Sequence, residues 1–190
     1  MTKNIMIVGV GGQGTLLASK LLGYVLLRQG YDVKVSEVHG MSQRGGSVVT
    51  YVRYGEKVYS PVIDKGEADI IISFEKLEAA RWLEYLKPEG LMITNTQEIE
   101  PMPVVTGAAV YPPELVEKMQ AAGVKVDAGD FLEIARQAGS SKAVNIALLG
   151  RFSKHFPEID EKYWREAIEV IVPQKFRELN FKAFEMGRSA

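Results

Sequence analysis

The sequence predicts a three-layer α/β/α sandwich, in which a mostly parallel sheet is covered by helices on both faces and interrupted by an antiparallel hairpin. Short apolar runs, typical of buried strands, alternate with stretches of helical periodicity along the 190 residues. A glycine-rich turn joins the first expected strand to the first helix, and two strand-like runs around Gly55 break the alternation. This length suits one domain, so we expect residues 1–190 to form a single domain.

The first elements follow the order strand, glycine turn, helix, strand. Residues 4–10 are an apolar run that ends in glycines, which predicts a buried strand. Residues 15–29 have helical periodicity, and Gly30 suits the C-terminal cap. Residues 31–37 predict the second strand. The apolar residues of the helix occupy more than one stripe, so we expect it to be buried on two sides: Leu16, Leu17, Leu21, Leu22, Tyr24, Val25, Leu26 and Leu27.

An antiparallel hairpin follows the second strand. Residues 47–54 and 57–62 are strand-like, and Gly55 at the first central turn position permits a type II′ turn. Beyond the hairpin, Asp130 is expected to cap a helix and Pro173 to separate the last two helices. The remaining expected elements are strands at 68–74, 91–94, 104–110 and 124–128, a turn at 87–90, and helices at 76–86, 113–122, 131–138, 143–155, 164–172 and 174–185.

The composition excludes several classes of protein. A net charge of -1 provides no basic field for nucleic acid. The absence of cysteine excludes disulfides, a cysteine nucleophile and any iron–sulfur cluster held by this chain's own thiolates. With only His39 and His155, a histidine-rich metal site is not expected. We find neither a signal-peptide pattern nor an apolar run of about 20 residues, so we expect a cytoplasmic protein without a membrane segment.

The first glycine loop fits a dinucleotide-binding, Rossmann-like start. Residues 9–14, GVGGQG, match the G-x-G-x-x-G pattern between a strand and a helix. Gly9 is expected to permit the turn, Gly11 to let a phosphate approach, and Gly14 to allow close helix–strand packing. Glu37 lies where a ribose-binding acid would sit, which favours NAD. The alternative is that the glycines serve packing alone.

The second glycine loop, residues 39–46 (HGMSQRGG), leaves the second strand at the edge where the first loop lies, so the two loops are expected to be neighbours. The Arg44 guanidinium can bind a phosphate or carboxylate through two parallel hydrogen bonds. Alternatively, Arg44 pairs with Glu37 or a helix C-terminus, and His39 holds a loop carbonyl. The candidate anion-binding residues are Gly11, Gly12, Gln13, Gly14, Ser42, Arg44, Gly45 and Gly46.

The segments "GVGGQGTLLASKLL" and "SEVHGMSQRGGSVVTYVRYG" resemble the gamma subunits or domains of 2-oxoacid:ferredoxin oxidoreductases. The resemblance is strongest to the small, beta subunit of the indolepyruvate:ferredoxin type, and it extends to "AVNIALLGRF" and "VPQKFRELNFKAFEMG". It covers nearly the whole chain. Paired glycine loops at this spacing are more specific than G-x-G-x-x-G alone.

The resemblance implies a division of labour. Such enzymes oxidatively decarboxylate 2-oxoacids, here aryl 2-oxoacids, to acyl-CoA and pass the electrons to ferredoxin. A large alpha subunit carries thiamine diphosphate, Mg²⁺ and the iron–sulfur clusters. The small subunit completes the complex, and its two loops are implied to touch a phosphate of coenzyme A. The isolated chain is therefore expected to bind no cofactor by itself and to be inactive. Separately, the apolar residues of the first helix predict a surface near the two loops that another subunit covers, with a homodimer as the substitute when the large subunit is absent. The alternative is that the C-terminal helices cover this surface.

Two other functions are compatible with the first loop: a stand-alone NAD-dependent dehydrogenase and a nucleotide-sensing regulatory domain. The hairpin and the Ser-Gln-Arg-Gly-Gly loop argue against both. A dehydrogenase also needs a substrate domain and an acid–base group, and the chain has little room for the first. The sequence offers no acid–base candidate beyond His39.

Overall fold

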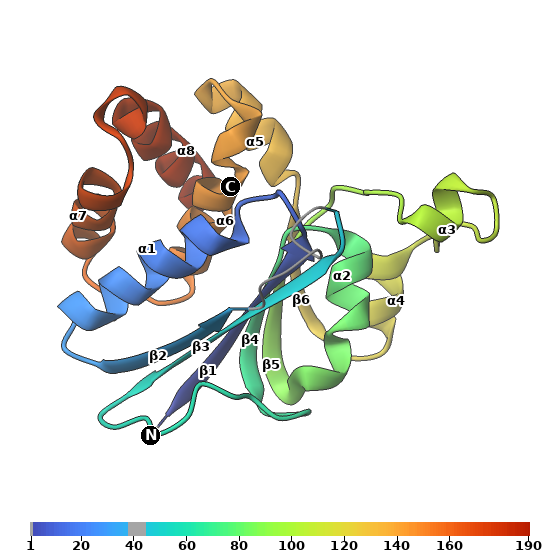
Figure 1. The fold of residues 1–190 in the computed structure, drawn as a ribbon, viewed down its shortest axis with the longest axis horizontal. Helices are drawn as coiled ribbons and strands as arrows, with labels where there is room; N and C mark the ends of the chain where they lie inside the picture. Colours follow the sequence, from blue (N-terminus) through green and yellow to red (C-terminus); the bar gives the residue numbers. More distant parts are fainter. Residues whose placement is uncertain (1, 38–44) are drawn as a thin grey trace.

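The fold is built on a six-stranded sheet with the strand order β2-β3-β1-β4-β5-β6 (Figure 1). The computed structural model describes residues 2–37 and 45–190. The strands are β1 (Lys3–Val10), β2 (Asp32–Glu37), β3 (Ser47–Gly55), β4 (Ala68–Ser73), β5 (Leu86–Asn95) and β6 (Lys125–Gly129). β1, β4, β5 and β6 pair in parallel, whereas β3 runs antiparallel to both β1 and β2. The mostly parallel sheet with an inserted antiparallel pair is confirmed.

The partner of the inserted strand differs from the prediction. β3 pairs with β2, and residues 57–62 are not a strand. Both edges of β3 are already occupied, by β1 on one side and β2 on the other. Polar groups of the 57–62 segment are satisfied by side chains instead: the Arg53 guanidinium donates to two carbonyl oxygens of the segment, and the Val58 N–H donates to Asp32 Oδ2 at 2.8 Å.

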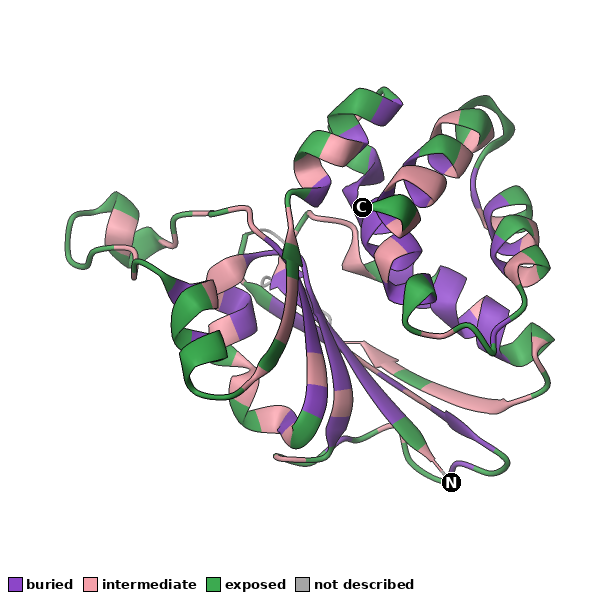
Figure 2. Ribbon diagram, turned by 180° about the vertical axis from the view of Figure 1, so that it is seen from behind, coloured by how far each residue is buried: buried purple, intermediate pink, exposed green. Residues whose placement is uncertain are grey.

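Helices cover both faces of the sheet, which confirms the three layers (Figures 1 and 2). None of the helices in the described ranges is long and apolar enough to cross a membrane. One face carries α1 (Thr15–Arg28), α5 (Phe131–Ala138), α6 (Val144–Lys154), α7 (Glu161–Ile171) and α8 (Arg177–Ser189). The other carries α2 (Lys76–Arg81) and α4 (Leu115–Ala121), while α3 (Met102–Val105) projects away from the body. Short 3-10 turns are η2 (Leu83–Tyr85), η3 (Ser141–Ala143) and η4 (Gln174–Phe176).

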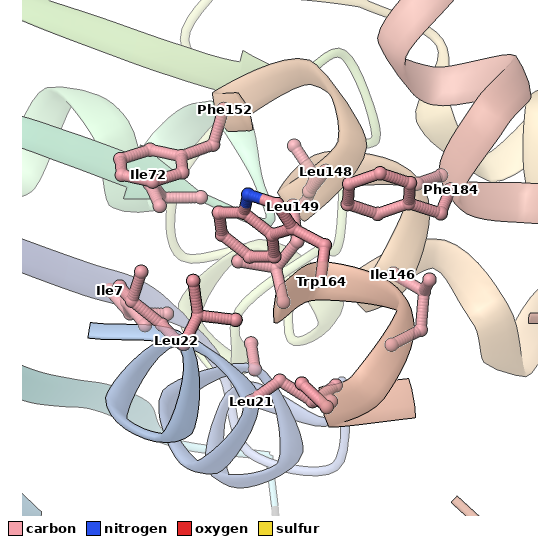
Figure 3. Packing of buried hydrophobic residues seen from close by; sticks show 14 of the residues in the cluster. Ile7, Leu21, Leu22, Ile72, Ile146, Leu148, Leu149, Phe152, Trp164 and Phe184 are labelled. Carbon is pink, nitrogen blue, oxygen red and sulfur yellow. The ribbon is translucent and has the colours of Figure 1, made fainter. Parts of the chain in front are cut away.

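Successive residues of β1 point into two different apolar clusters, as the period of two in a strand requires. Ile5 and Ile7 face the cluster under the larger helical layer, and Met6 and Val8 face the cluster under α2 and α4. All four are fully buried, which explains why β1 appears in the sequence as a continuous apolar run. Figure 3 shows Ile7 beside Leu22 and Ile72, with aromatic side chains of α6, α7 and α8 above them.

The first helix is buried on two sides, as predicted, because it lies between the sheet and the C-terminal helices. Val25 and Leu26 are fully buried within the chain's own core. Tyr24 is half-buried, and its hydroxyl donates to Glu166 of α7 at 2.8 Å. Leu27 remains 58% exposed. The C-terminal helices therefore cover most, but not all, of the apolar surface of α1.

Two glycines allow α6 and α8 to approach until their backbones touch. A Cβ atom at Gly150 of α6 would overlap the carbonyl oxygen of Phe184, and a Cβ atom at Gly187 of α8 would overlap the carbonyl oxygen of Ala147. Neither glycine is needed for a turn, because both lie inside helices. Their role is to let the C-terminal helix close over the core.

Two smaller expectations were wrong. The 87–90 segment, predicted as a turn, is part of β5. Leu86 pairs with Ala68 of β4, whereas Leu91 pairs with Ile70, only two residues further along β4. The residues between Leu86 and Leu91 therefore bulge out of the ladder. In the 104–110 segment, predicted as a strand, Val104 and Val105 form the end of the short helix α3, and the remaining residues follow it without regular structure. Pro101 and Pro103 at the start of α3 favour a helical turn, and both edges of β5 are occupied.

The α6–α8 contact predicts a large effect of one methyl group. Gly150→Ala should destabilise the fold by about 3 kcal/mol, because the added Cβ forces two packed backbones apart. Gly23→Ala is the matched control, since its Cβ would meet only Val35 Cγ2 at 3.8 Å. That change should stabilise α1 by about 1 kcal/mol through helix propensity. Urea unfolding of the three chains measures both effects, and equal stability of the two variants would contradict this account.

Candidate functional site

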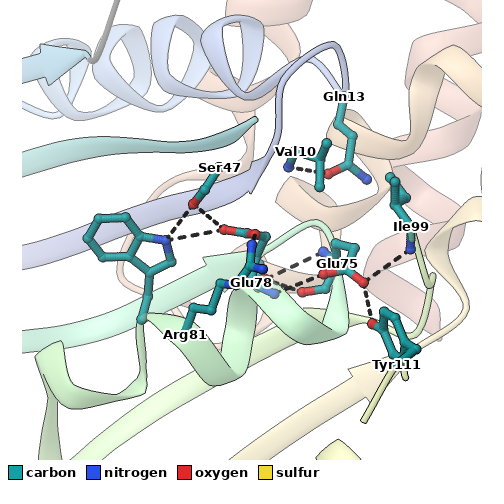
Figure 4. A network of polar contacts seen from close by, with 10 residues as sticks. Val10, Gln13, Ser47, Glu75, Glu78, Arg81, Ile99 and Tyr111 are labelled. Atoms are coloured by element: carbon teal, nitrogen blue, oxygen red, sulfur yellow. Dashed lines mark hydrogen bonds and ion pairs between the residues drawn. The ribbon is translucent and has the colours of Figure 1, made fainter. Parts of the chain in front are cut away.

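The first glycine loop is closed by one of its own side chains. Gln13 Oε1 accepts from the Val10 N–H at 2.7 Å (Figure 4), and Gln13 Nε2 donates to the Phe74 carbonyl oxygen at 3.0 Å. The same Nε2 lies 3.2 Å from Gln97 Oε1. The amide therefore joins the carboxyl ends of β1 and β4 to the segment that follows β5. Gln13 has a structural task, in addition to its predicted place among the anion-binding residues.

The glycines of this loop have other tasks than those expected. Gly9 still lies in β1, and its Cβ would meet Gln13 Oε1 at 2.9 Å, so Gly9 makes room for the glutamine amide. Gly14 has φ +90°, and a Cβ there would meet Asn145 Nδ2 of α6 at 2.7 Å. The close approach at Gly14 is thus to a helix of the C-terminal half rather than to the strand.

The two glycine loops are neighbours, as the sequence predicted. The Gly11 N–H donates to the Gly46 carbonyl oxygen at 2.8 Å, and Gly45 adopts φ +92° beside it. Gly11 consequently uses its N–H within the fold and does not offer it to a phosphate. His39, Ser42, Gln43 and Arg44 lie outside the described residues.

The start of α1 is arranged as a helix N-terminus without a side-chain cap. Gly14 is the N-cap residue, and its carbonyl oxygen accepts from the N–H groups of Leu17 and Ala18 at 3.1 and 3.2 Å. Since glycine has no side chain, the N–H groups of the first turn have no capping oxygen there. The positive end of the helix dipole faces the same place, so this terminus favours a negative group.

Two cavities flank this helix terminus, and their charges differ. The first, about 260 Å³, lies between the loop and β3 and includes the Glu37 carboxylate. The second, about 420 Å³, is lined by Gly12, Gln13 and Gly14 on one side and by Ser141 and Lys142 on the other. An anion is repelled by Glu37 and attracted by Lys142. The second cavity is therefore the better anion site.

One oxygen of the Glu37 carboxylate is engaged inside the fold. Its Oε1 accepts from the Ser19 hydroxyl of α1 at 2.7 Å, which ties the end of β2 to the helix. Ser19 is fully buried, and its hydroxyl oxygen also lies 2.9 Å from the Leu16 carbonyl oxygen, so the contact belongs to the α1–β2 packing. The expected ribose acid is thus used inside the fold.

Two buried carboxylates, which the sequence did not single out, stabilise the same edge of the sheet. Glu78 is 1% exposed and binds the Ser47 hydroxyl, the Arg81 guanidinium at 2.6 Å and the Trp82 indole N–H at 3.3 Å (Figure 4). Because Ser47 begins β3, Glu78 anchors the exit of the second glycine loop to α2. Burial of these charges is tolerated because each oxygen has a donor.

Glu75, the second of these carboxylates, caps α2 and is also 1% exposed. Its oxygens accept from the Glu78 N–H at 2.8 Å, the Ile99 N–H at 3.2 Å and the Tyr111 hydroxyl. Burial raises the pKa of the Tyr111 hydroxyl, and its hydrogen bond to Glu75 raises it further. Tyr111 therefore remains a hydrogen-bond donor throughout the physiological pH range.

Lys142, Gln97 and Asn145 join the glycine loop from distant parts of the chain. Asn145 Nδ2 donates to the Gly14 carbonyl oxygen at 3.3 Å, and Lys142 belongs to η3 just before α6. The only sequence signal for Lys142 is its place after Ser140, whose hydroxyl accepts from the Lys142 N–H at 3.3 Å. Within the described residues, no group of three or more His, Cys, Asp or Glu is arranged to hold a metal ion.

A comparison with known protein families and curated proteins gives full-length matches. A family model described as pyruvate ferredoxin/flavodoxin oxidoreductase matches residues 4–190. The chain is 46% identical to the indolepyruvate oxidoreductase subunit IorB of Thermococcus kodakarensis, over 98% of this chain and 95% of that protein. The later segments, and not only the glycine loops, are therefore shared with these relatives.

Solved structures match the same fold. The pyruvate oxidoreductase subunit PORC of Thermotoga maritima is similar with a TM-score of 0.76 at 22% identity, covering 99% of this chain and 96% of that one. A 2-oxoglutarate:ferredoxin oxidoreductase from Magnetococcus marinus, solved with 2-oxoglutarate, coenzyme A and succinyl-CoA bound, is similar with a TM-score of 0.76 at 19% identity. It covers 99% of this chain and 30% of that one, so the fold also occurs as one part of a longer chain.

The position of the Gln13 amide predicts a pH-dependent variant. In Gln13→Glu, a carboxylate would face the Phe74 carbonyl oxygen and Gln97 Oε1, where an N–H donor is required. The folded-state pKa of the new carboxyl should rise above the unfolded value of about 4.3, since the charged form is repelled. The stability of the variant is then highest below pH 4 and falls as pH rises through the raised pKa.

We expect Gln13→Glu to be less stable than the parent by about 2 kcal/mol at pH 7, and by less at pH 4. Thermal melting of both chains at the two pH values measures the difference. The exposed Gln174→Glu is the control and should melt like the parent chain at both pH values. A deficit for Gln13→Glu that does not change with pH would contradict the assigned hydrogen bonds.

Proposed function

The chain belongs to the pyruvate ferredoxin/flavodoxin oxidoreductase family, and we propose that it acts there as the small subunit of a 2-oxoacid:ferredoxin oxidoreductase of the indolepyruvate type. The observation that carries this proposal is the 46% identity to an indolepyruvate oxidoreductase subunit over nearly the whole of both chains. A common gamma subunit of pyruvate and ketoisovalerate oxidoreductases, from Pyrococcus furiosus, is similar at 25% identity. We assign indolepyruvate-type substrates because the identity to the indolepyruvate oxidoreductase subunit is higher than the identity to the common gamma subunit.

The chain works as part of an enzyme complex with a larger partner subunit. Its sequence contains no cysteine, so any iron–sulfur cluster bound through thiolates is held elsewhere. We assign thiamine diphosphate, Mg²⁺ and the clusters to the large subunit, which passes electrons to ferredoxin. In such a complex, residues 1–190 act as one domain that supplies a binding surface rather than the reacting groups.

The two alternative functions are not supported. In this fold, Gln13 fills the glycine loop, the Gly11 N–H is bonded to Gly46, and Glu37 is bonded to Ser19. The three features that favour a dinucleotide in the sequence are therefore all engaged by the chain itself. The relatives reported above are subunits of oxidoreductase complexes, rather than stand-alone dehydrogenases or sensors.

For the glycine loops, we propose a contact with the phosphate-bearing part of coenzyme A. The backbone of Gly12, the N-cap residue Gly14 of α1 and Lys142 meet at the 420 Å³ cavity. A phosphate there would gain the helix N-terminus and a lysine ammonium group together. Ser42, Arg44, Gly45 and Gly46 are the second group of predicted anion-binding residues, and Arg44 remains a sequence-based assignment. Thiamine diphosphate supplies the decarboxylation chemistry, whereas the residues of this chain would orient the acyl acceptor.

The purified chain should not oxidise indolepyruvate in the presence of coenzyme A and a viologen acceptor, because it provides no thiamine site or clusters. Adding the large subunit should restore reduction of the acceptor. Turnover by the small chain alone, or a reconstituted complex inactive with every aryl 2-oxoacid, would overturn the proposal.

In the reconstituted complex, Lys142→Ala and Arg44→Ala should each raise the KM for coenzyme A about tenfold, the equivalent of about 1.4 kcal/mol. The KM for the 2-oxoacid should stay unchanged. Lys57→Ala removes an exposed lysine outside both cavities and serves as the control. An unchanged KM for coenzyme A in Lys142→Ala would remove the second cavity from the assignment.

A further inference from the structure

A charge-free segment projects from the sheet edge between β5 and α4. Residues 101–113, PMPVVTGAAVYPP, contain no acidic or basic residue, and we call them the proline arm. Figures 1 and 2 show α3 and its loop extending away from the rest of the molecule. Between residues 102 and 110, every residue except Val104 is exposed. The side chains of Met102, Val105 and Val110 are 68%, 59% and 87% exposed.

Both ends of the proline arm are fixed to one buried group. The Ile99 N–H just before the arm and the Tyr111 hydroxyl near its end both bind Glu75 Oε1 (Figure 4). Glu75 in turn caps α2 and is almost fully buried. The arm is therefore held at its base by the body of the protein, even though its tip has no core of its own.

The tip of the arm is ordered by local bonds. The Val104 N–H donates to the Pro101 carbonyl oxygen at 2.8 Å, and the Ala109 N–H donates to the Pro103 carbonyl oxygen at 3.0 Å. The Thr106 hydroxyl donates to the Met102 carbonyl oxygen at 2.9 Å. Four prolines further restrict the chain. A segment ordered before it binds loses less conformational entropy on docking.

The exposed apolar tip has the composition of an interface core. Charged residues are depleted at the buried centre of protein interfaces, and contiguous exposed apolar surface on a soluble protein marks a partner site. The base of the arm is acidic instead. Glu100, Glu114 and Glu117 are exposed and form no ion pair with other described residues. Lys118 is the nearby cation and donates to the Pro113 carbonyl oxygen.

The arm also starts beside the candidate anion site. Gln97, two residues before Ile99, lines the 420 Å³ cavity and lies 3.2 Å from Gln13 Nε2. A protein that receives the arm would consequently sit next to this cavity. The geometry suits a complex in which the site lies between two subunits.

We propose that the proline arm inserts into an apolar groove with a basic rim on the large subunit of the complex. The inference rests on the proposed function, which supplies that subunit. The exposed apolar tip requires an apolar groove that buries it, and the exposed Glu100, Glu114 and Glu117 at the base of the arm call for basic residues around that groove. The partner is thereby placed against the carboxyl edge of the sheet, at the glycine loops.

Co-purification of the tagged chain with the large subunit tests the proposal, with binding measured by titration. Val105→Asp places a charge on the tip and should weaken assembly at least tenfold. Val170→Asp, on α7, is the matched control: the same substitution at a valine that is 61% exposed, compared with 59% for Val105. It should assemble like the parent chain. Both free variants should melt at the parent temperature, because neither side chain lies in the core.

Hydrogen exchange on the unmutated chain gives an independent readout. The amides of Val105, Thr106 and Ala109 should exchange more slowly in the complex than in the free chain. Unchanged exchange in the arm, undiminished assembly of Val105→Asp, or equal weakening by Val170→Asp would overturn the proposal. A concentration-dependent dimer of the free chain that Val105→Asp dissociates would instead assign the arm to a second copy.

The failure of this inference can be told apart from the failure of the proposed function. If the parent chain assembles with the large subunit and the complex reduces the acceptor, the proposed function stands whatever Val105→Asp does. If the parent chain does not bind the large subunit at all, both the proposed function and the role of the arm are wrong.

Discussion

β3 lies antiparallel between β1 and β2, and both of its edges form hydrogen-bonded ladders. This insertion moves β2 to the edge of the sheet, while β2 still runs in the direction of β1. The segments that leave β1 and β2 therefore emerge at the same edge and meet at the Gly11–Gly46 hydrogen bond. A plain parallel arrangement would leave the first loop open on that side. With β3 in place, the loop is supported by a neighbour and sealed by Gln13.

At the carboxyl edge of the sheet, the acidic side chains are bonded within the fold, whereas a basic side chain is exposed. Glu75 and Glu78 are buried and fully engaged with donors, and Glu37 is bonded to Ser19. These acids hold α1, α2 and β3 in place, whereas the exposed Lys142 faces a cavity. The edge thus combines internal carboxylates, which fix its shape, with an outward ammonium group and a helix N-terminus. This arrangement suits recognition of an anion better than acid–base catalysis.

Much of the fold was predictable because burial imposes a period on the sequence. β1 and β4 are buried on both faces and therefore appear as apolar runs in the sequence. Asp130 is a typical N-cap residue and predicts the start of α5, where its carboxylate accepts from the Glu133 N–H at 2.9 Å. Pairing partners were less predictable. Nothing within residues 57–62 says that both edges of β3 are taken, so the expected hairpin partner cannot pair with β3. The expected strand at 104–110 fails because Pro101 and Pro103 favour the helical turn of α3.

The candidate site was predictable only where it is local in sequence. The glycines of residues 9–14 and the adjacency of the two loops follow from the motif and from the direction of the strands. Lys142 and Asn145 reach the loop from about 130 residues away, through the packing of α6 against α1, and no local pattern marks them. The hydrogen bonds by which the Gln13 amide closes the first glycine loop could not be predicted either, because a glutamine in a glycine-rich loop has many available partners.

The two outer strands of the sheet have a consequence for the lifetime of the free chain. Among residues 2–37 and 45–190, no strand pairs with the outer edge of β2 or β6, and an open ladder edge is the kind of surface on which chains add to one another and aggregate. Both strands are short, and each carries a lysine held in an ion pair: Lys34 with Asp32 at 2.7 Å, and Lys125 with Glu89 at 2.7 Å. A strand arriving from another molecule would have to bury these charges. The sheet is thereby protected against growth at both ends, so a newly made subunit can remain dispersed until it finds its partner.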